Sequence, residues 1–149
     1  MKRDLKLSDY LPYRLSVASN EVSRLIAESY EDRFGLKIPE WRVIAVLAEF
    51  NAHTQAEIVA KTAMDKVTVS RAVAGLVARD LVRRSINEAD GRSQIVALTK
   101  AGKRLFDDIS PLARDYEARL LDGFSPREID SLKTLLQRIE ARARRERVR

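Results

Sequence analysis

The segment from residue 54 to residue 100 constrains the fold of this chain more than any other part of it. It reads TQAEIVAKTAMDKVTVSRAVAGLVARDLVRRSINEADGRSQIVALTK. Thr54 and Glu57 have the spacing of a capping box, which predicts a short helix beginning there. A second helix is expected from near Asp65, whose charge suits the positive end of a helix dipole, to about Asp80. Two short helices in this succession predict a helix-turn-helix.

A β-hairpin is expected directly after these two helices. Residues 81–86 and 94–98 are short β-prone runs, and the polar loop between them turns at Asp90-Gly91. The complete order is therefore a helix-turn-helix followed by a hairpin wing. We expect a fold that is mostly α-helical, with this small β-hairpin beside it.

Two helices are also expected before residue 54. Ser8 and Asp9 are placed to cap a first helix that runs to about Arg33 with an apolar stripe along it. Gly35 is expected to end this helix. Pro39 is expected to open the second, because a proline is tolerated in the first turn.

Two more helices are expected after residue 99. Thr99 can cap a long fifth helix, and Ser125-Pro126-Arg127-Glu128 supplies a cap, an N1 proline and a capping-box glutamate for a sixth. Because apolar stripes occur at both ends and no linker is visible, we expect a single domain over residues 1–149. Residues 39–99 would form the winged-helix lobe, and residues 1–34 and 100–149 the dimerisation helices. A monomeric bundle that covers its own stripes is the alternative.

The composition argues against several classes of protein. The 149-residue chain has no cysteine, which excludes disulfides, thiolate zinc sites and cysteine redox sensing. One histidine, no glycine-rich phosphate loop and no metal-spaced cluster argue against an enzyme, a metal site and a cofactor. The start, MKRDLKLSDY, lacks the apolar segment of a secretory signal, and no apolar run approaches the ~20 residues of a membrane span. We therefore expect a cytoplasmic protein without a membrane partner.

The helix expected from near Asp65 to about Asp80 is the fourth in the chain. It combines an apolar side with a polar side made of small residues. On a helical wheel the apolar residues gather on the side expected to face the core. The other side is small near its middle, so the helix can approach the edges of DNA bases closely. Arginine can contact guanine or phosphate there, and hydroxyl groups can form hydrogen bonds to bases or to phosphates. A solvated helix face is the alternative. The candidate DNA-binding residues on this helix are Lys66, Thr68, Ser70 and Arg71.

The hairpin adds the candidate DNA-binding residues Arg83, Arg84 and Arg92. A guanidinium at a hairpin tip suits a narrow minor groove, where negative potential is concentrated. Arg83 and Arg84 alternate across a strand, so at most one of them faces DNA directly. Charged loops are often only solvated, but the position of this one after a helix-turn-helix favours a role in DNA binding.

Much of the basic charge lies outside this region. The net charge of +6 and the pI of about 9.8 favour a polyanionic partner. Residues 54–99 contain seven Lys and Arg against five Asp and Glu, whereas residues 138–149 contain six Arg against two Glu. The C-terminal tail can add salt-sensitive phosphate contacts. We favour a solvated helix end, since cations suit a helix C-terminus.

Five runs carry a family resemblance. They are EWRV at 40–43, DKVTVSR at 65–71, DLVRR at 80–84, DGR at 90–92 and VALTKAG at 96–102. Together they resemble the MarR family of bacterial winged-helix regulators, and the order of elements extends the resemblance over nearly the whole chain. The resemblance implies a homodimer built from the N- and C-terminal helices. It also implies binding to a pseudo-palindromic operator in double-stranded DNA and repression that a ligand relieves.

The resemblance also implies roles for individual residues. Ser70 and Arg71 would contact the major groove and Arg92 the minor groove, with Asp65 holding Arg92 through an ion pair. Asp90, at the turn of the loop, is the second candidate for positioning the wing. Family members often have a second wing arginine where this chain has Gly91. This departure reduces the expected minor-groove contribution to one arginine.

The resemblance further implies a small-molecule effector. Family members commonly respond to phenolic or other aromatic carboxylic acids, or to their coenzyme A thioesters, bound between the dimerisation helices and the DNA-binding lobe. Tyr13, Arg14, Trp41, Arg42 and His53 are the candidates here, because they offer aromatic walls and a cation for a carboxylate. A core position for Trp41 and a surface or capping role for His53 are the alternatives.

These observations predict a sequence-specific transcriptional regulator and not an enzyme. Its simplest form is a homodimeric repressor, released from its operator by a small aromatic or carboxylic ligand or a coenzyme A thioester. A non-specific architectural DNA-binding protein, using the basic tail and Arg92, is the alternative. The salt dependence of binding and the ratio of specific to non-specific affinity distinguish the two.

Overall fold

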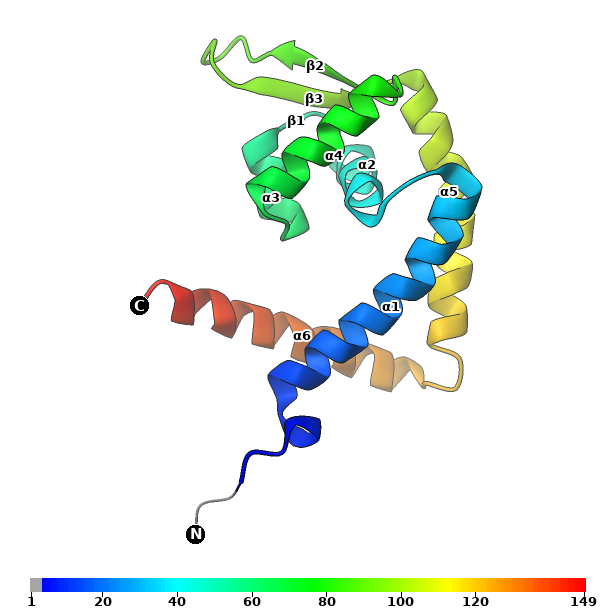
Figure 1. The fold of residues 1–149 in the computed structure, drawn as a ribbon, viewed down its shortest axis with the longest axis vertical. Coiled ribbons are helices and arrows are strands. Elements are labelled where there is room, and N and C mark those ends of the chain that lie inside the picture. Colours follow the sequence, from blue (N-terminus) through cyan, green and yellow to red (C-terminus); the bar gives the residue numbers. More distant parts are fainter. Residues whose placement is uncertain (1–3) are drawn as a thin grey trace. The chain divides into compact units, whose positions relative to one another are not determined.

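The computed structural model describes residues 4–149, so the basic start of the chain, residues 1–3, lies outside the described part. Internal contacts divide the chain into two compact units, Met1–Ile109 and Ser110–Arg149. Helices make up most of both, and a small antiparallel sheet belongs to the first (Figure 1). The expected fold class, mostly α-helical with a hairpin wing, is confirmed. The organisation as a single domain stays a prediction.

The first unit begins with a 3-10 turn, Leu7–Asp9, followed by α1, Leu11–Phe34. The predicted cap of α1 by Ser8 and Asp9 is wrong. Both residues belong to the 3-10 turn, and Tyr10 occupies the cap position without a side-chain cap hydrogen bond. Over the described residues, no helix is long and apolar enough to cross a membrane.

Gly35 ends α1 as predicted. Its φ of 60° lies in the left-handed region that glycine adopts without strain, and its N–H donates to the Glu31 carbonyl. The next helix, α2, spans Ile38–Phe50 and has Pro39 in its first turn, also as predicted. The turn between α1 and α2 is therefore fixed by backbone chemistry at both ends.

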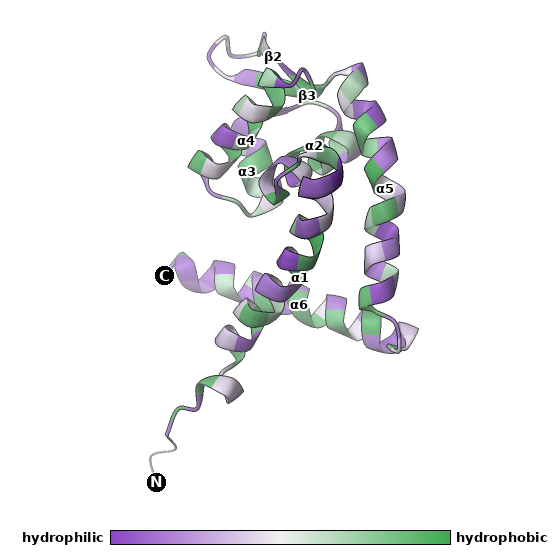
Figure 2. Ribbon diagram, turned by 45° about the vertical axis from the view of Figure 1, so that its right-hand side comes forward, coloured by the Kyte–Doolittle hydropathy of each residue, from purple (hydrophilic) through white to green (hydrophobic). Residues whose placement is uncertain are grey.

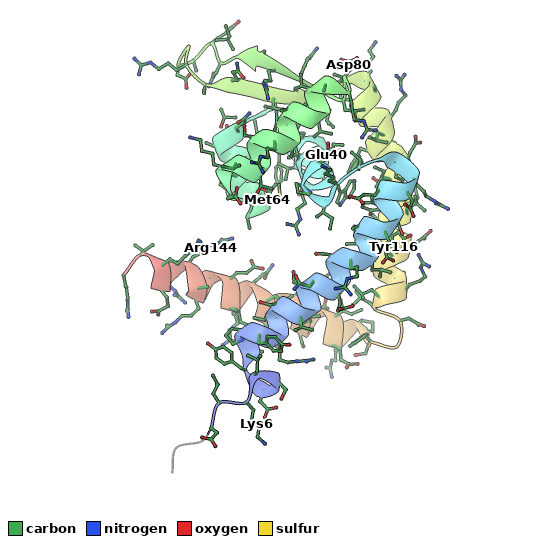
Figure 3. The ribbon with its side chains drawn as sticks, in the orientation of Figure 1. Lys6, Glu40, Met64, Asp80, Tyr116 and Arg144 are labelled. Atoms are coloured by element: carbon green, nitrogen blue, oxygen red, sulfur yellow. The ribbon has the colours of Figure 1, made fainter. Side chains whose placement is uncertain are left out.

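The helix-turn-helix consists of α3, Gln55–Thr62, and α4, Lys66–Ala78. The capping box of α3 is present as predicted. The predicted end of α4 at Asp80 is two residues too late. Asp80 has a φ of 57°, and the Leu81 N–H donates to the Leu76 carbonyl at 2.9 Å, which closes the helix earlier. Figure 3 shows Asp80 at this end of α4.

The sheet has three strands in the order β1-β3-β2, all antiparallel. The wing strands β2, Val82–Ile86, and β3, Gln94–Leu98, match the expected hairpin, with β2 beginning one residue later than predicted. The third strand, β1, is His53–Thr54 and pairs with β3. This pairing attaches the segment between α2 and α3 to the base of the wing.

The core of the first unit lies where α2, α3 and α4 pack together beside the sheet (Figure 1). Apolar side chains from every one of these elements are almost fully excluded from solvent, which is the main source of stability for such a lobe. The most deeply buried are Val43, Ile44, Leu47, Ile58, Val69, Val73, Leu76, Val82 and Val96. This core holds α4 in place with its apolar side inward.

Two helices complete the chain. α5 spans Lys100–Leu120 and contains Pro111, which removes one helical hydrogen bond close to the boundary between the two units. α6 spans Pro126–Arg147 and begins with the predicted capping box of Ser125 and Glu128. Hydrophilic residues dominate the C-terminal turns of α6 (Figure 2).

Candidate nucleic-acid interface

The apolar and polar sides of α4 lie as the helical wheel predicts. Val69, Val73 and Leu76 are buried in the core. The opposite side is open to solvent over the first two turns, and Val67 in its middle is 58% exposed. Of the four candidates on this surface, Lys66, Ser70 and Arg71 are exposed and Thr68 is half-buried. A cationic, hydroxyl-bearing surface of this shape can lie in a major groove. We call the solvent-facing residues of this stretch, Lys66, Val67, Thr68, Ser70 and Arg71, the reading face.

Asp65 fixes the beginning of the reading face. Its carboxylate accepts hydrogen bonds from the Thr68 N–H at 2.8 Å and from the Thr68 hydroxyl at 2.9 Å. These bonds from Thr68, the backbone one foremost, lower the pKa of the Asp65 carboxyl below its ordinary range. The expected ion pair between Asp65 and Arg92 is absent from the described residues. Both carboxylate oxygens of Asp65 cap α4, so Asp65 positions the reading face in this structure, and its role in holding the wing stays a prediction.

The tip of the wing is organised by Asp90. Its Oδ1 accepts hydrogen bonds from the N–H groups of Arg92 and Ser93, both at 3.0 Å, and its Oδ2 accepts from the Ser93 hydroxyl at 2.7 Å. The Ser93 hydroxyl is the main cause of the lowered pKa of the Asp90 carboxyl, followed by the two backbone donors. Asn87 adds a side-chain bond from Nδ2 to the Ser93 Oγ at 3.1 Å. The loop therefore holds the backbone of Arg92 in one conformation.

The arginines of the wing present their guanidinium groups to solvent. Arg92 is exposed at the tip and forms no ion pair within the described residues. Arg83 lies opposite Ala97 and Arg84 opposite the buried Val96, so the two point to different faces of the hairpin, as expected. Gly91 has a φ of 67°, a conformation that disfavours an arginine at this position.

A carboxylate behind the reading face was not singled out by the sequence. Glu40, near the start of α2 (Figure 3), is 9% exposed. A Cβ at Gly75 would lie 2.9 Å from its Oε2. Gly75 therefore lets α4 approach this side chain closely. A hollow of about 290 Å³ beside them is lined by Lys37, Pro39, Glu40, Thr68, Arg71, Ala72 and Gly75.

Arg79 is a second residue whose position the sequence did not reveal. It follows α4 and stands near the wing arginines in the sequence. In the structure its Nη1 donates to the Gly35 carbonyl at 3.1 Å and its Nη2 to the Phe34 carbonyl at 2.9 Å. No local pattern signals these bonds, because the partners are more than forty residues apart in the chain.

The candidate effector residues do not gather in one place. Trp41 lies in an aromatic cluster, with its ring centroid 5.4 Å from that of Tyr30 and 5.9 Å from that of Phe106. Tyr13 and Arg14 are exposed near the start of α1. At a rise of 1.5 Å per residue, Arg14 is about 24 Å along the helix from Tyr30. Arg42 is exposed beside Trp41. A single chain therefore does not combine Tyr13 and Arg14 with Trp41.

His53 belongs to the link between α2 and α3. Its Nδ1 lies 2.9 Å from the Glu57 Oε2, and its ring meets Phe50 edge-on at 5.9 Å. Its Nε2 is buried without a hydrogen-bond partner. The pKa of the Glu57 carboxyl is lowered, first by the Thr54 backbone N–H and then by His53. Within the described residues, no group of three acidic or histidine side chains could hold a metal ion.

Known proteins resemble this chain over the segment that contains the candidate interface. The sequence profile of the MarR family matches residues 34–93. The transcriptional repressor NicR of Pseudomonas putida is 31% identical over 96 residues, or 64% of this chain. The alignment spans 61% of the length of NicR.

Solved structures extend the similarity to most of the chain. A MarR family transcriptional regulator from Silicibacter pomeroyi is 30% identical and has a TM-score of 0.78, with 89% of each chain covered. BpsR of Bordetella bronchiseptica, whose DNA binding is regulated by 6-hydroxynicotinic acid, is 25% identical with a TM-score of 0.80. The superposition covers 87% of this chain and 98% of BpsR.

Proposed function

Because this chain belongs to the MarR family of transcriptional regulators, we propose that it is a homodimeric repressor of a pseudo-palindromic operator. The observation that carries the proposal is the pairing of an exposed reading face on α4 with an ordered wing that ends in Arg92. The first suits a major groove and the second an adjacent minor groove. In this assignment Ser70 and Arg71 contact bases, while Lys66 and one of Arg83 and Arg84 contact the backbone. Thr68 would contact the backbone by turning its hydroxyl hydrogen from Asp65 to a phosphate oxygen.

Apolar surface at both ends of the chain supports dimerisation. Near the start of α1, Leu7, Leu11 and Tyr13 are at least 40% exposed. α6 carries a row of exposed apolar side chains at helical spacing: Leu132, Leu135, Leu136 and Ile139. Large exposed apolar surfaces mark interaction sites in folded proteins. Two copies joined through such surfaces would present two reading faces to half-sites about 34 Å apart.

We further propose that a small aromatic carboxylic acid, free or as its coenzyme A thioester, releases the repressor from DNA. The regulation of BpsR by 6-hydroxynicotinic acid supports this ligand class. The ligand would favour a dimer whose reading faces are wrongly spaced for successive major grooves, so that the population of the DNA-binding form falls. Because Tyr13 and Arg14 lie far along α1 from Trp41, a site that uses all three requires both protomers.

Selection of bound fragments from genomic DNA at physiological salt tests the proposal. We expect enrichment of one inverted repeat with half-sites a helical turn apart. Addition of 6-hydroxynicotinic acid or benzoic acid, as simple aromatic acids, is expected to reduce binding to that repeat. Uniform recovery of all fragments would contradict a specific repressor and favour an architectural protein that binds through its basic tail.

A further inference from the structure

Arg79 connects the C-terminal end of α4, the helix that carries the reading face, to the C-terminal end of α1. Its two terminal nitrogens donate to the carbonyls of Phe34 and Gly35, which are consecutive residues. The last carbonyls of a helix lack partners within it and carry the negative end of its dipole. A planar guanidinium offers two parallel N–H groups to such a pair of acceptors. The contact therefore satisfies the end of α1 and fixes the side chain of Arg79.

Both attachment points are held by the backbone. On one side, Gly35 adopts a φ of 60° as the chain leaves α1. On the other, the Arg79 N–H donates to the Gly75 carbonyl, and Asp80 follows in the left-handed conformation. The Asp80 carbonyl in turn accepts the Thr99 hydroxyl at 2.7 Å. A side-chain bond between two fixed turns can transmit a displacement from one to the other.

The length of α4 makes its orientation sensitive to this contact. The helix has 13 residues and is therefore about 20 Å long. A tilt of about 10° at its C-terminal end would move Lys66 at the other end by about 3 Å, from the same length. Such a displacement exceeds the range over which a hydrogen bond to a base survives. The reading face lies in the half of α4 that is farther from Arg79.

We propose that Arg79 is a positioning residue, which sets the orientation of α4 against α1 and does not contact DNA. The inference rests on the proposed function, in which α4 binds DNA and α1 takes part in the dimer interface. In a dimer joined through α1, Arg79 would carry a change in subunit arrangement to the reading face. Its positive charge then serves the end of α1 and not a phosphate.

Binding to the selected inverted repeat tests the assignment. Arg79→Met keeps the length of the side chain but removes every donor, and we expect affinity to fall about tenfold. The slope of log affinity against log salt should stay unchanged, whereas a lost phosphate contact would lower it by about one. Arg83→Met and Arg84→Met, on the wing, are the comparison variants. Unchanged affinity or a reduced slope for Arg79→Met would overturn the proposal.

A distance measurement separates this inference from the proposed function. The chain has no cysteine that would compete for a spin label. Labels can therefore be attached to Asn20→Cys in α1 and Lys66→Cys in α4 of the otherwise unchanged protein. Labelled protein is diluted with unlabelled protein so that distances come from one chain. We expect a narrow distribution with Arg79 and a broader or shifted one with Arg79→Met. An unchanged distribution would overturn the proposal even if the protein binds its operator. Failure to bind any repeat would contradict only the proposed function.

Two further variants guard against simple unfolding. Arg79→Lys keeps the charge but cannot offer a fork to two carbonyls, so its distance distribution should lie between the other two. The Gly35 carbonyl is presented by a left-handed backbone conformation. Alanine at this position would be strained in that conformation, whereas asparagine tolerates it. Arg79→Met and Gly35→Ala act on one contact, so their effects on operator affinity should not add. Full additivity would show that they act separately.

Discussion

Arg92 combines a fixed backbone with a free side chain. Its N–H is bound to Asp90, while its guanidinium is exposed and outside every ion pair of the described residues. Such an arrangement keeps the entropy lost on binding small, because the loop is ordered before DNA arrives. In the proposed function, minor-groove binding by the wing depends on this single residue.

We expect Arg92→Ala to weaken binding to the operator by about 1–3 kcal/mol while the protein stays folded. The reason is the loss of one cation from the narrow groove, where negative potential is concentrated. Fluorescence anisotropy with a labelled operator measures the effect. Arg104→Ala, an exposed arginine on α5, is the matched control and should bind as the wild type does. Equal affinities for both variants would remove the wing from the mechanism.

Carboxylates that cap or close turns give the protein an acid-sensitive stability. The pKa values of Glu57, Asp65, Asp90 and Glu128 are all lowered, in each case by hydrogen bonds that the charged form accepts. A lowered pKa in the folded state means that the unfolded chain binds more protons in the window just below the ordinary carboxyl range. The stabilisation is therefore complete above that range and is lost as the pH falls through the lowered values.

Urea unfolding at pH 7 and at steps down to pH 3 is expected to show this loss. Asp65→Asn provides the matched control, because asparagine caps a helix about as well as aspartate but does not titrate. Its stability at pH 7 should be close to that of the wild type, and its loss in acid should be smaller. A variant with the full wild-type loss would show that Asp65 does not contribute to the pH dependence.

At the scale of elements, local chemistry explains most of what the sequence could predict. Capping boxes at Thr54 and Ser125 specify where α3 and α6 begin, and Gly35 specifies where α1 ends. All three act through hydrogen bonds between residues close in the chain. α4 ends early because Asp80 takes the left-handed conformation usually filled by glycine or asparagine. β1 is only two residues long, too short to show a strand pattern.

Contacts between elements that are distant in the chain could not be predicted from the sequence. Among the described residues, Asp65 and Arg92 form no ion pair, and both oxygens of Asp65 accept hydrogen bonds from Thr68, three residues away. The bonds of Arg79 to α1 connect residues that no periodicity relates. The sequence could nominate residues for the candidate interface, whereas the contacts that hold those residues depend on how α1, α2 and α4 pack.

One such contact gives a stability prediction. A Cβ at Gly102, in the first turn of α5, would lie 2.1 Å from the Leu81 carbonyl oxygen. That oxygen also accepts the Thr99 N–H, so it cannot easily move. Helix propensity alone would favour alanine by up to about 1 kcal/mol, but the overlap with backbone dominates. We expect Gly102→Ala to lower the free energy of unfolding by about 2–3 kcal/mol in urea titrations.

Lys103→Ala is the control for this prediction. It introduces an alanine at the next position of the same helix, where the side chain is exposed, and should leave stability nearly unchanged. If Gly102→Ala were as stable as the control, α5 would not be docked against the turn between α4 and β2 in solution.

At the scale of the whole molecule, the proposed function depends on two copies of the chain. A single reading face and wing bind one half-site, and a pseudo-palindromic operator offers two. Linking two binding events through a dimer raises overall affinity by factors of 10² to 10⁴. The exposed apolar row on α6 is the surface on which this linkage can be tested, since Leu135 in its middle is 50% exposed.

We expect Leu135→Glu to produce a folded monomer, because a charge cannot be buried without a partner in an apolar interface. Light scattering after size-exclusion chromatography measures the mass, and circular dichroism checks that helix content is kept. Affinity for the full inverted repeat should fall at least about a hundredfold, and affinity for an isolated half-site should hardly change. Gln137→Glu places the same charge two residues on, about 160° around α6 from Leu135, and should remain dimeric. A Leu135→Glu protein that stays dimeric and binds like the control would exclude this row of side chains from the interface.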